Sequence, residues 1–358
     1  MKQTLTDANF PRTADLRVYH LGLRPGEVAN RIVTVGSPSR AHTIAAQFDA
    51  TPKPFELSSE RGFLTITGRY KGVPVSVVSI GMGHPNVDFF VREVRECLSG
   101  DMLIVRSVFS FHLARAMGRH RGRALGSCGS LIDVPVGSVV VPKSSVAVER
   151  NLDFDFVNPG ECTERPYKIS RPVLADPELH NQVHKSLAAA KPPDGKTIIA
   201  GTTNASADSF YSSQGRQTSF PDQNENLIEF LQASVKDLAT FEMETFWLYH
   251  LAACWTGRKE TAGRSHAPPL ATGPVQPTTS HPSPAKVIPN ALAGHETVIR
   301  AAAAQMVFAS RTSQDFITPE EVATLEDWTA KGVLDALAVM TIAPDRVHAE
   351  EGSVWELA

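Results

Sequence analysis

The sequence predicts an α/β fold, and three observations support this prediction. Short apolar runs of β-type composition recur along the chain, such as Arg31–Val35 and Asp101–Val105. Segments with apolar residues at helical spacing alternate with these runs, among them Pro177–Ala190. Small-residue turns follow several strands, as Gly36–Arg40 follows the first. Strands that alternate with helices and end in such turns are typical of a sheet covered by helices.

The other elements follow in order along the chain. Further strands are expected at Gly62–Arg69, Val73–Ile80, Leu131–Pro142, Ser145–Arg150, Thr197–Ala200 and Thr297–Ser310. Further helices are expected at Ala41–Phe48, Asn86–Leu98, Asn226–Leu231 and Ala239–Trp255, and a final helix or pair of helices at Pro319–Leu337.

We expect a single folded domain over residues 18–340, between a flexible N-terminal tail (1–17) and a polar C-terminal tail (341–358). Two insertions interrupt the domain. Residues 107–124 are abruptly basic and separate a strand from a small-residue turn. Residues 257–293 are rich in Pro, Thr, Ser and Gly, with almost no periodicity, and predict a loose loop.

Composition narrows the class of protein. The 358 residues are 42% hydrophobic and 20% charged, with a formal net charge of −3, so no global field favours nucleic acid. No segment approaches the roughly 18 apolar residues of a membrane helix, and the N-terminus lacks a signal-peptide core. Four cysteines without CxxC spacing suit a reducing cytoplasm and argue against structural zinc. We therefore expect a cytoplasmic protein that binds neither nucleic acid nor membrane.

The stretch Thr197–Arg216 is the most informative for function. An apolar run breaks at Gly201 into small and polar residues, which is how α/β domains present ligand sites at strand ends. Gln214 offers an amide donor and acceptor, and Arg216 offers a rigid fork of donors. Together they match the edge of a flat carbonyl-bearing ring, whose face Phe210 can cover.

Other polar residues near predicted strand ends suit an anion and a sugar. Arginines together with Gly/Ser turns suit a tetrahedral oxyanion such as phosphate. Arg40 and Arg106 are such arginines, and Ser127 lies in such a turn. Glu244 can accept hydrogen bonds from sugar hydroxyls. The chain has no Walker loop, no HExxH motif and no nucleophile elbow, and no GxGxxG motif follows a strand.

These motifs together resemble a known family. VYHLGL, VGSPSR, LGSCG, SFYSSQGR, FEMET and SRTSQDF occur in this order and at domain-scale spacing. They resemble the uridine phosphorylases of the nucleoside phosphorylase superfamily over most of residues 18–340. The resemblance implies a three-layer α/β/α fold with a central mixed, twisted sheet. It also implies reversible phosphorolysis of uridine to uracil and ribose 1-phosphate, in pyrimidine nucleoside salvage.

The resemblance also implies roles for individual residues. Phosphate would be held by Gly36, Arg40, Arg106 and Ser127; without the insertion, Arg106 has the family's spacing from Gly126. Ribose would be bound by Met243 and Glu244. The base would be bound by Gln214 and Arg216, with Phe210 lining its pocket and Arg311 behind it. The catalytic residues would be Arg106, Gln214 and Arg216. Because His20 and Arg61 would reach the neighbouring subunit's ribose and phosphate, the smallest working unit would be a homodimer.

No cofactor is implied, because phosphate is a co-substrate. Some relatives bind a cation at the subunit interface, and Gly62 stands where they have a ligating glutamate, which argues against that site here. Two alternatives remain open. One is a purine nucleoside or methylthioadenosine phosphorylase, although Gln214 and Arg216 match the pyrimidine pattern. The other is a catalytically inactive nucleoside-binding homologue, because the insertion separates Arg106 from Ser127.

Overall fold

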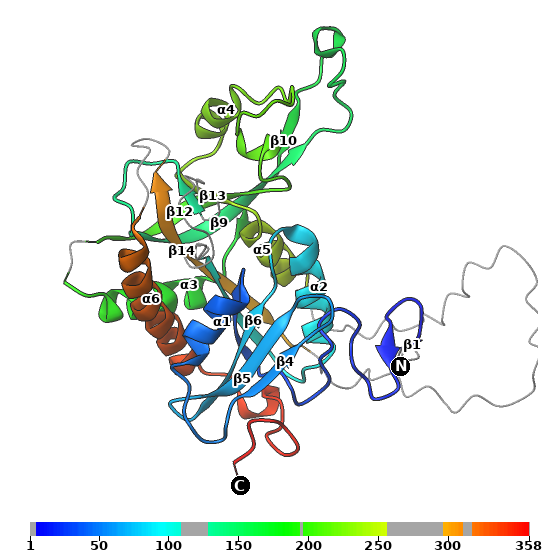
Figure 1. The fold of residues 1–358 in the computed structure, drawn as a ribbon, viewed down its shortest axis with the longest axis vertical. Helices are drawn as coiled ribbons and strands as arrows, with labels where there is room; N and C mark the ends of the chain where they lie inside the picture. The colour runs from blue at the N-terminus through cyan, green and yellow to red at the C-terminus, as the bar shows by residue number, and fades with distance from the viewer. Residues whose placement is uncertain (1–4, 109–127, 194–195, 256–295, 311–316, 358) are drawn as a thin grey trace, which may run out of the picture.

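The computed structural model describes residues 5–108, 128–193, 196–255, 296–310 and 317–357. Within these ranges, one large mixed sheet crosses the molecule (Figure 1). Its strands are β3 (Arg31–Val35), β4 (Phe55–Ser58), β5 (Leu64–Tyr70), β6 (Val73–Ser79), β7 (Met102–Val108), β8 (Cys128–Ser130), β9 (Val139–Arg150), β10 (Tyr167–Ile169), β11 (Val173–Leu174), β12 (Ile198–Ala207), β13 (Leu238–Glu242) and β14 (Ile299–Ser310).

The strand order is β10-β9-β12-β13-β8-β14-β7-β3-β6-β5-β4, with β11 also on β9. The central strands β14, β7, β3 and β6 are parallel, and β5 and β4 continue antiparallel to one edge. β14 also pairs antiparallel with β9, so β9, β12, β13, β8 and β14 form a closed ring. The predicted mixed sheet is therefore confirmed.

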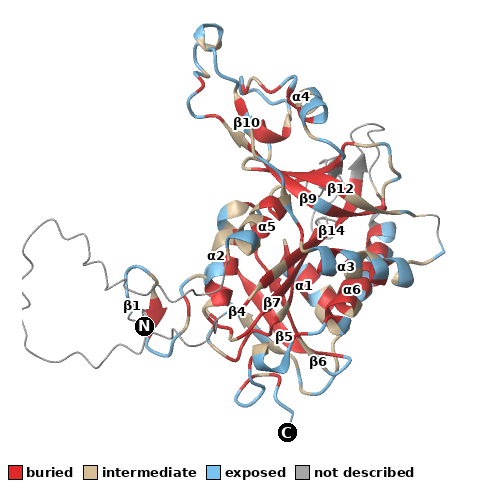
Figure 2. Ribbon diagram, turned by 180° about the vertical axis from the view of Figure 1, so that it is seen from behind, coloured by how far each residue is buried: buried red, intermediate tan, exposed pale blue. Residues whose placement is uncertain are grey.

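Helices cover both faces of the sheet, as the three-layer prediction requires. They are α1 (Pro38–Ala45), α2 (His84–Arg95), α3 (Pro177–Ala190), α4 (Leu227–Ser234), α5 (Thr245–Cys254) and α6 (Pro319–Val339), with 3₁₀ turns η1 (Pro159–Glu161), η2 (Ser212–Gln214) and η3 (Pro344–Arg346). Val33 and Val105 face a core made with α1, α3 and α6, whereas Ile32 and Ile104 face a core made with α2 and α5. This alternation within single strands explains why apolar residues follow one another directly in β3 and β7. Figure 2 shows the buried sheet between the helices.

One predicted helix is partly wrong. Residues 239–255 carry apolar residues at helical spacing, but the structure splits them into strand β13 and helix α5. Leu238–Glu242 pairs with β12 on one side and β8 on the other, so sheet pairing overrides the local pattern. As a result, Glu242 ends a strand and Glu244 precedes the first turn of a helix.

The bounds of two neighbouring strands, β9 and β12, also differ from the prediction, and both differences have the same cause. β9 continues through Pro142, where two strands were expected, and β12 continues past Gly201, where a break was expected. The register between them shifts at this point, since Ala200 lies opposite Val141 and Thr202 opposite Pro142. Proline cannot donate to the ladder, and Gly201 adopts a positive φ of 77° that a bulge requires. Because the bulge accommodates Pro142 and Gly201, β9 and β12 each continue as one strand through positions where the sequence predicts a break.

The expected tails and first insertion also have different boundaries. Within 5–17, β1 (Leu5–Thr6) pairs with β2 (Arg12–Thr13). Within 341–357, Trp355 is 1% exposed, so the C-terminal segment packs on the domain instead of extending as a tail. Ser107 and Val108 belong to β7, where they pair with β14, so these first two residues of the expected insertion are part of the sheet. The rest of that insertion and all of 257–293 lie outside the described residues.

Candidate active site

Three predicted phosphate ligands come together at the ends of neighbouring elements. Gly36 follows β3, Arg40 lies in the first turn of α1, and Arg106 lies in β7, which pairs with β3. A Cβ atom placed on Gly36 would lie 3.5 Å from Nη1 of Arg40 and 3.7 Å from Nη2 of Arg106. Both arginines are buried, with 7% and 3% exposure respectively. We refer to Gly36, Arg40 and Arg106 as the arginine cluster.

The electrostatics of this cluster favour an anion. Burial, followed by the charge of Arg106, lowers the pKa of Arg40 to about 9, and Glu326 and Glu244 oppose that shift. Nε and Nη1 of Arg106 are buried and have no hydrogen-bond partner among the described residues. Buried charged donors are costly when unpaired, so an oxyanion here would gain charge-assisted hydrogen bonds.

Glu244 lies directly against this cluster. Its Oε2 is 3.1 Å from Nη2 of Arg106, and its Oε1 accepts a 2.7 Å hydrogen bond from the backbone N–H of Gly83. Met243, beside it in the turn between β13 and α5, is partly buried. The carboxylate and the arginine cluster thus form one continuous polar surface.

The sequence analysis missed Glu242, which organises this turn. Its buried carboxylate accepts hydrogen bonds from Asn204, Ser206 and the backbone N–H groups of Glu244 and Thr245. Burial, and then the charge of Glu244, raise the pKa of Glu242 to about 7. The run Glu242-Met243-Glu244 is the available signal, but the helical spacing of residues 239–255 predicts it at the start of a helix.

The expected base-binding residues form a second group, around η2. Nη2 of Arg216 donates to Oε1 of Gln214 at 3.3 Å, and the Arg216 guanidinium lies 4.2 Å from the ring centroid of Phe210. Gln214 is 2% exposed, and Gly215 turns the chain between the two polar residues with a φ of 63°. Burial lowers the pKa of Arg216. A preformed amide, guanidinium and aromatic face are therefore held together, as a flat polar ring requires.

Asn224 holds the backbone of this second group in place. Its Nδ2 donates to the carbonyl oxygens of Ser212 and Arg216, at 2.8 and 3.2 Å. Among the described residues, no hydrogen bond or ion pair joins this group to the arginine cluster.

His20 and Arg61 form a third group at another part of the surface. Nδ1 of His20 lies 2.6 Å from Oε1 of Glu93, and its ring stacks on Phe89 at 3.8 Å. Arg61 is exposed and lies over the ring of Tyr19 at 4.2 Å, with a hydrogen bond to its hydroxyl. Within the described ranges, neither residue contacts the arginine cluster. Ser127 and Arg311 lie outside those ranges.

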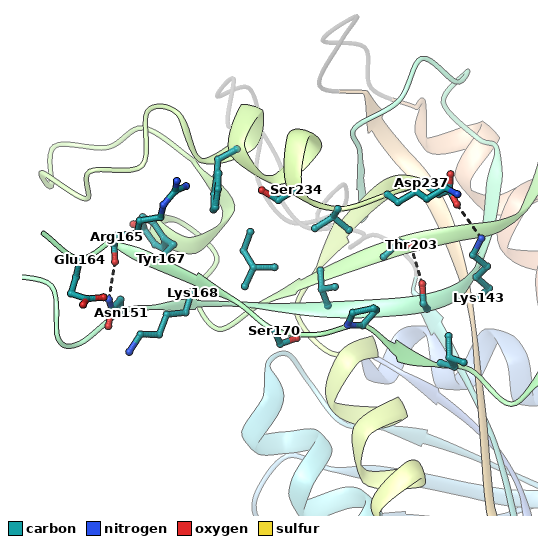
Figure 3. Close-up of a pocket in the computed structure, with 18 of the residues that line it drawn as sticks. Lys143, Asn151, Glu164, Arg165, Tyr167, Lys168, Ser170, Thr203, Ser234 and Asp237 are labelled. Carbon is teal, nitrogen blue, oxygen red and sulfur yellow. Dashed lines mark hydrogen bonds and ion pairs between the residues drawn. The ribbon is translucent and has the colours of Figure 1, made fainter.

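A cavity elsewhere in the molecule contains none of the predicted site residues. It has a volume of about 890 Å³ and lies along β9 and β10 near α4 (Figure 3). Arg165 and Phe230 line one end, and the ion pair of Lys143 and Asp237 lines the other. This cavity and the predicted site residues therefore occupy different places.

Two features of the described residues bear on other classes of site. No three His, Cys, Asp or Glu side chains gather there as a metal site would require. In the same ranges, no helix combines the length and apolarity needed to cross a bilayer.

Comparison with known proteins identifies the class of protein that has this fold. A family model described as the phosphorylase superfamily matches residues 30–255, and the chain belongs to this superfamily. Among individual relatives, the uridine phosphorylase of Thermococcus kodakarensis is 29% identical over 257 residues, which cover 70% of this chain and 78% of the relative. A DeoD-type purine nucleoside phosphorylase of Streptococcus suis is 28% identical over 235 residues, covering 65% and 79%.

Solved structures extend the comparison to the whole fold. A structure from a study of two uridine phosphorylases of the oomycete Phytophthora capsici superposes with a TM-score of 0.73. It is 34% identical, and the match covers 95% of this chain and all of that one. A Trypanosoma brucei nucleoside phosphorylase superposes with a TM-score of 0.64 at 19% identity, a likeness of fold alone.

Proposed function

We propose that the protein is a uridine phosphorylase, a pentosyltransferase that converts uridine and phosphate reversibly into uracil and ribose 1-phosphate. The observation that carries the proposal is the burial and incomplete hydrogen bonding of the Arg106 guanidinium. This guanidinium is buried beside Gly36 and Arg40 and in contact with Glu244, and two of its nitrogens have no hydrogen-bond partner within the described part of the chain. A phosphate on this cluster would lie next to a carboxylate able to hold ribose hydroxyls.

The reaction needs charge stabilisation at both ends of the breaking bond. Cleavage of the glycosidic bond builds positive charge on the ribose and negative charge on the leaving uracil. Phosphate bound by Arg40 and Arg106, with Ser127 as a further ligand, would stabilise the ribose cation and capture its C1′. Met243 and Glu244 would hold the ribose so that C1′ faces the phosphate.

The leaving base would be stabilised by the group around η2. Gln214 and Arg216 would donate to the uracil carbonyl oxygens as they gain charge, and Phe210 would cover the ring. Arg311 would stand behind the base. No cofactor takes part in this scheme, since the nucleophile is the phosphate itself.

The working unit in this proposal is a homodimer or a larger homo-oligomer. His20 and Arg61 lie apart from the arginine cluster of their own chain, which favours a role in a neighbour's site. There they would meet the ribose 5′ end and the phosphate. Pyrimidine salvage in the cytoplasm is the setting that the proposed reaction implies.

A purine nucleoside phosphorylase is the second candidate, favoured by the similarity to the DeoD-type relative. Purified protein is incubated with uridine or inosine, with and without phosphate, and the released base is separated by chromatography. Phosphate-dependent release of uracil, faster than that of hypoxanthine, is expected. Release of hypoxanthine alone would reverse the assignment. Calorimetric binding of uridine without turnover would indicate the inactive homologue.

A deletion variant tests whether the insertion interferes with the site. Because Ser107 and Val108 pair with β14, the deletion should start at residue 109 and end at 124. Retained or increased uracil release in this variant would show that the inserted segment is dispensable for phosphate binding.

A further inference from the structure

Hydrogen-bond donors surround the buried carboxylate of Glu242 and favour its ionised form, whereas burial opposes ionisation. Its oxygens receive hydrogen bonds from Nδ2 of Asn204 at 2.7 Å and from the hydroxyl of Ser206. The backbone N–H of Glu244 donates at 2.8 Å, and that of Thr245 at 3.0 and 3.1 Å. Among the described residues, Oε2 faces only the backbone N–H groups of Glu244 and Thr245, which cannot become acceptors, so a proton on Oε2 would displace at least one of these contacts.

The bonds of Glu242 hold the turn that carries the proposed ribose ligands. The two N–H groups belong to Glu244 and Thr245, at the start of α5, where the positive end of the helix dipole also favours a carboxylate. The same turn places Glu244 against Arg106 and the backbone of Gly83. A continuous set of contacts thus runs from β12, through Glu242, to the arginine cluster.

A wider polar network fixes the carboxylate from behind. Asn204 and Ser206 lie in β12, and Nδ2 of Asn204 also donates to the hydroxyl of Ser145 in β9 at 2.9 Å. The hydroxyl of Ser206 further accepts from the backbone N–H of Phe246 in α5 at 2.8 Å. All of these residues are buried, so the network is shielded from water and its geometry is well defined.

We propose that Glu242 is a positioning residue, whose ionised carboxylate holds Met243 and Glu244 in the geometry that binds ribose. It acts through the turn and does not touch the nucleoside. The inference rests on the proposed function, because it assigns ribose binding to Met243 and Glu244. It adds a residue to which neither the motifs nor the resemblance assigned a role.

The pH dependence of activity is a consequence of this arrangement. Burial and the neighbouring charge of Glu244 raise the pKa of Glu242 to about 7. The titratable groups facing it are Glu244 in the same turn and Tyr249 of α5, with Arg106 of β7 paired to Glu244. Protonation below this pH removes an acceptor from the turn. We therefore expect kcat/KM for uridine to fall as the pH decreases through about 7.

The test compares Glu242→Gln with wild type and with Ser144→Ala between pH 5.5 and 8.5. The glutamine keeps the volume but turns a donor toward the backbone N–H groups. Its KM for uridine should rise at least tenfold, by more than its KM for phosphate, and the inflection near pH 7 should disappear. Ser144→Ala removes a buried hydroxyl of β9 that bonds to Thr203 at 2.9 Å and not to the residues around Glu242, and should keep both KM and inflection. A Glu242→Gln enzyme with KM within twofold of wild type and the inflection intact would overturn the proposal.

A substitute variant and a pair of crystal structures keep the proposal testable if Glu242→Gln does not fold or if the enzyme is inactive. If circular dichroism shows that Glu242→Gln does not fold, Ser206→Ala takes its place. Loss of that donor should move the inflection to higher pH, and an unmoved inflection overturns the proposal. Crystal structures of wild type and variant give a readout without activity: the contact of Glu244 with Gly83 should be lost, and an unchanged turn counts against the proposal. If wild type cleaves no nucleoside, the proposed function fails, whereas these structures still decide the role of Glu242.

Discussion

The carboxylate of Glu244 and the guanidinium of Arg106 form a buried ion pair, with Oε2 and Nη2 3.1 Å apart. One residue lies in the central strand β7 and the other in the turn between β13 and α5. The pair therefore couples the proposed phosphate and ribose ligands. Each charge is 5% exposed or less, so each depends on the other for its stability in the interior.

Removal of one member of this pair should harm both stability and activity. We expect Arg106→Ala to lower the free energy of unfolding by about 3–5 kcal/mol, because it leaves the carboxylate buried without its partner. It should also reduce kcat/KM for phosphate by roughly 10²–10³. Urea unfolding and steady-state kinetics measure these effects.

A double-mutant cycle isolates the pair. Arg106→Ala combined with Glu244→Ala should destabilise by less than the sum of the single changes, because no charge is left unpaired. Arg92→Ala is the matched control, since it breaks an exposed ion pair with Asp88 on α2. It should change stability by no more than about 0.5 kcal/mol. Strict additivity in the cycle would contradict the coupling.

Arg216 should contribute to catalysis more than to the fold. Arg216→Ala removes a donor to the leaving base, and kcat for uridine should fall by roughly 10²–10³ with the circular dichroism spectrum unchanged. Arg165→Ala is a matched control, because Arg165 lies over Phe230 at 4.1 Å much as Arg216 lies over Phe210. That control should keep wild-type kcat. Unchanged uridine cleavage in Arg216→Ala would remove Arg216 from the mechanism.

Shared sites predict complementation between two inactive variants. Arg61→Ala lacks the residue given to the neighbour, and Arg106→Ala lacks a residue of its own site. In a mixed dimer, one of the two sites receives Arg106 from one chain and Arg61 from the other, so that site is complete. Co-expressed chains should therefore recover about a quarter of the wild-type activity per site, given random pairing of equal amounts. Activity no higher than that of the separate variants would indicate a site made within one chain.

The C-terminal segment should stabilise the domain without taking part in the chemistry. Trp355 is buried, and its backbone carbonyl accepts a 2.8 Å hydrogen bond from Nη1 of Arg69 in β5. Trp355→Ala should lower the free energy of unfolding by about 3–5 kcal/mol through loss of packing. Leu357→Ala, at a side chain 53% exposed, should change it by less than about 0.5 kcal/mol. Equal denaturation midpoints for the two variants would show that the segment does not support the core.

Local patterns predicted most elements because their signals lie within the elements themselves. Pro177–Ala190 forms α3 with the predicted bounds, and its N-cap Asp176 accepts from the backbone N–H of Leu179. The paired strands β5 and β6 were predicted for the same reason, since the turn between them is encoded in adjacent residues. The error at 239–255 arose where apolar spacing alone does not distinguish a strand followed by a helix from one helix.

The sequence by itself determined the alternation of strands and helices, the motifs that carry the family resemblance, and the residue types available for phosphate, ribose and base. Those properties depend on neighbours along the chain. Only the tertiary structure decided that Arg106 meets Glu244, that Asn204 holds Glu242 beside them, and that Trp355 closes the domain. These contacts depend on strand order and burial, which bring distant residues together and which no local pattern of side chains specifies.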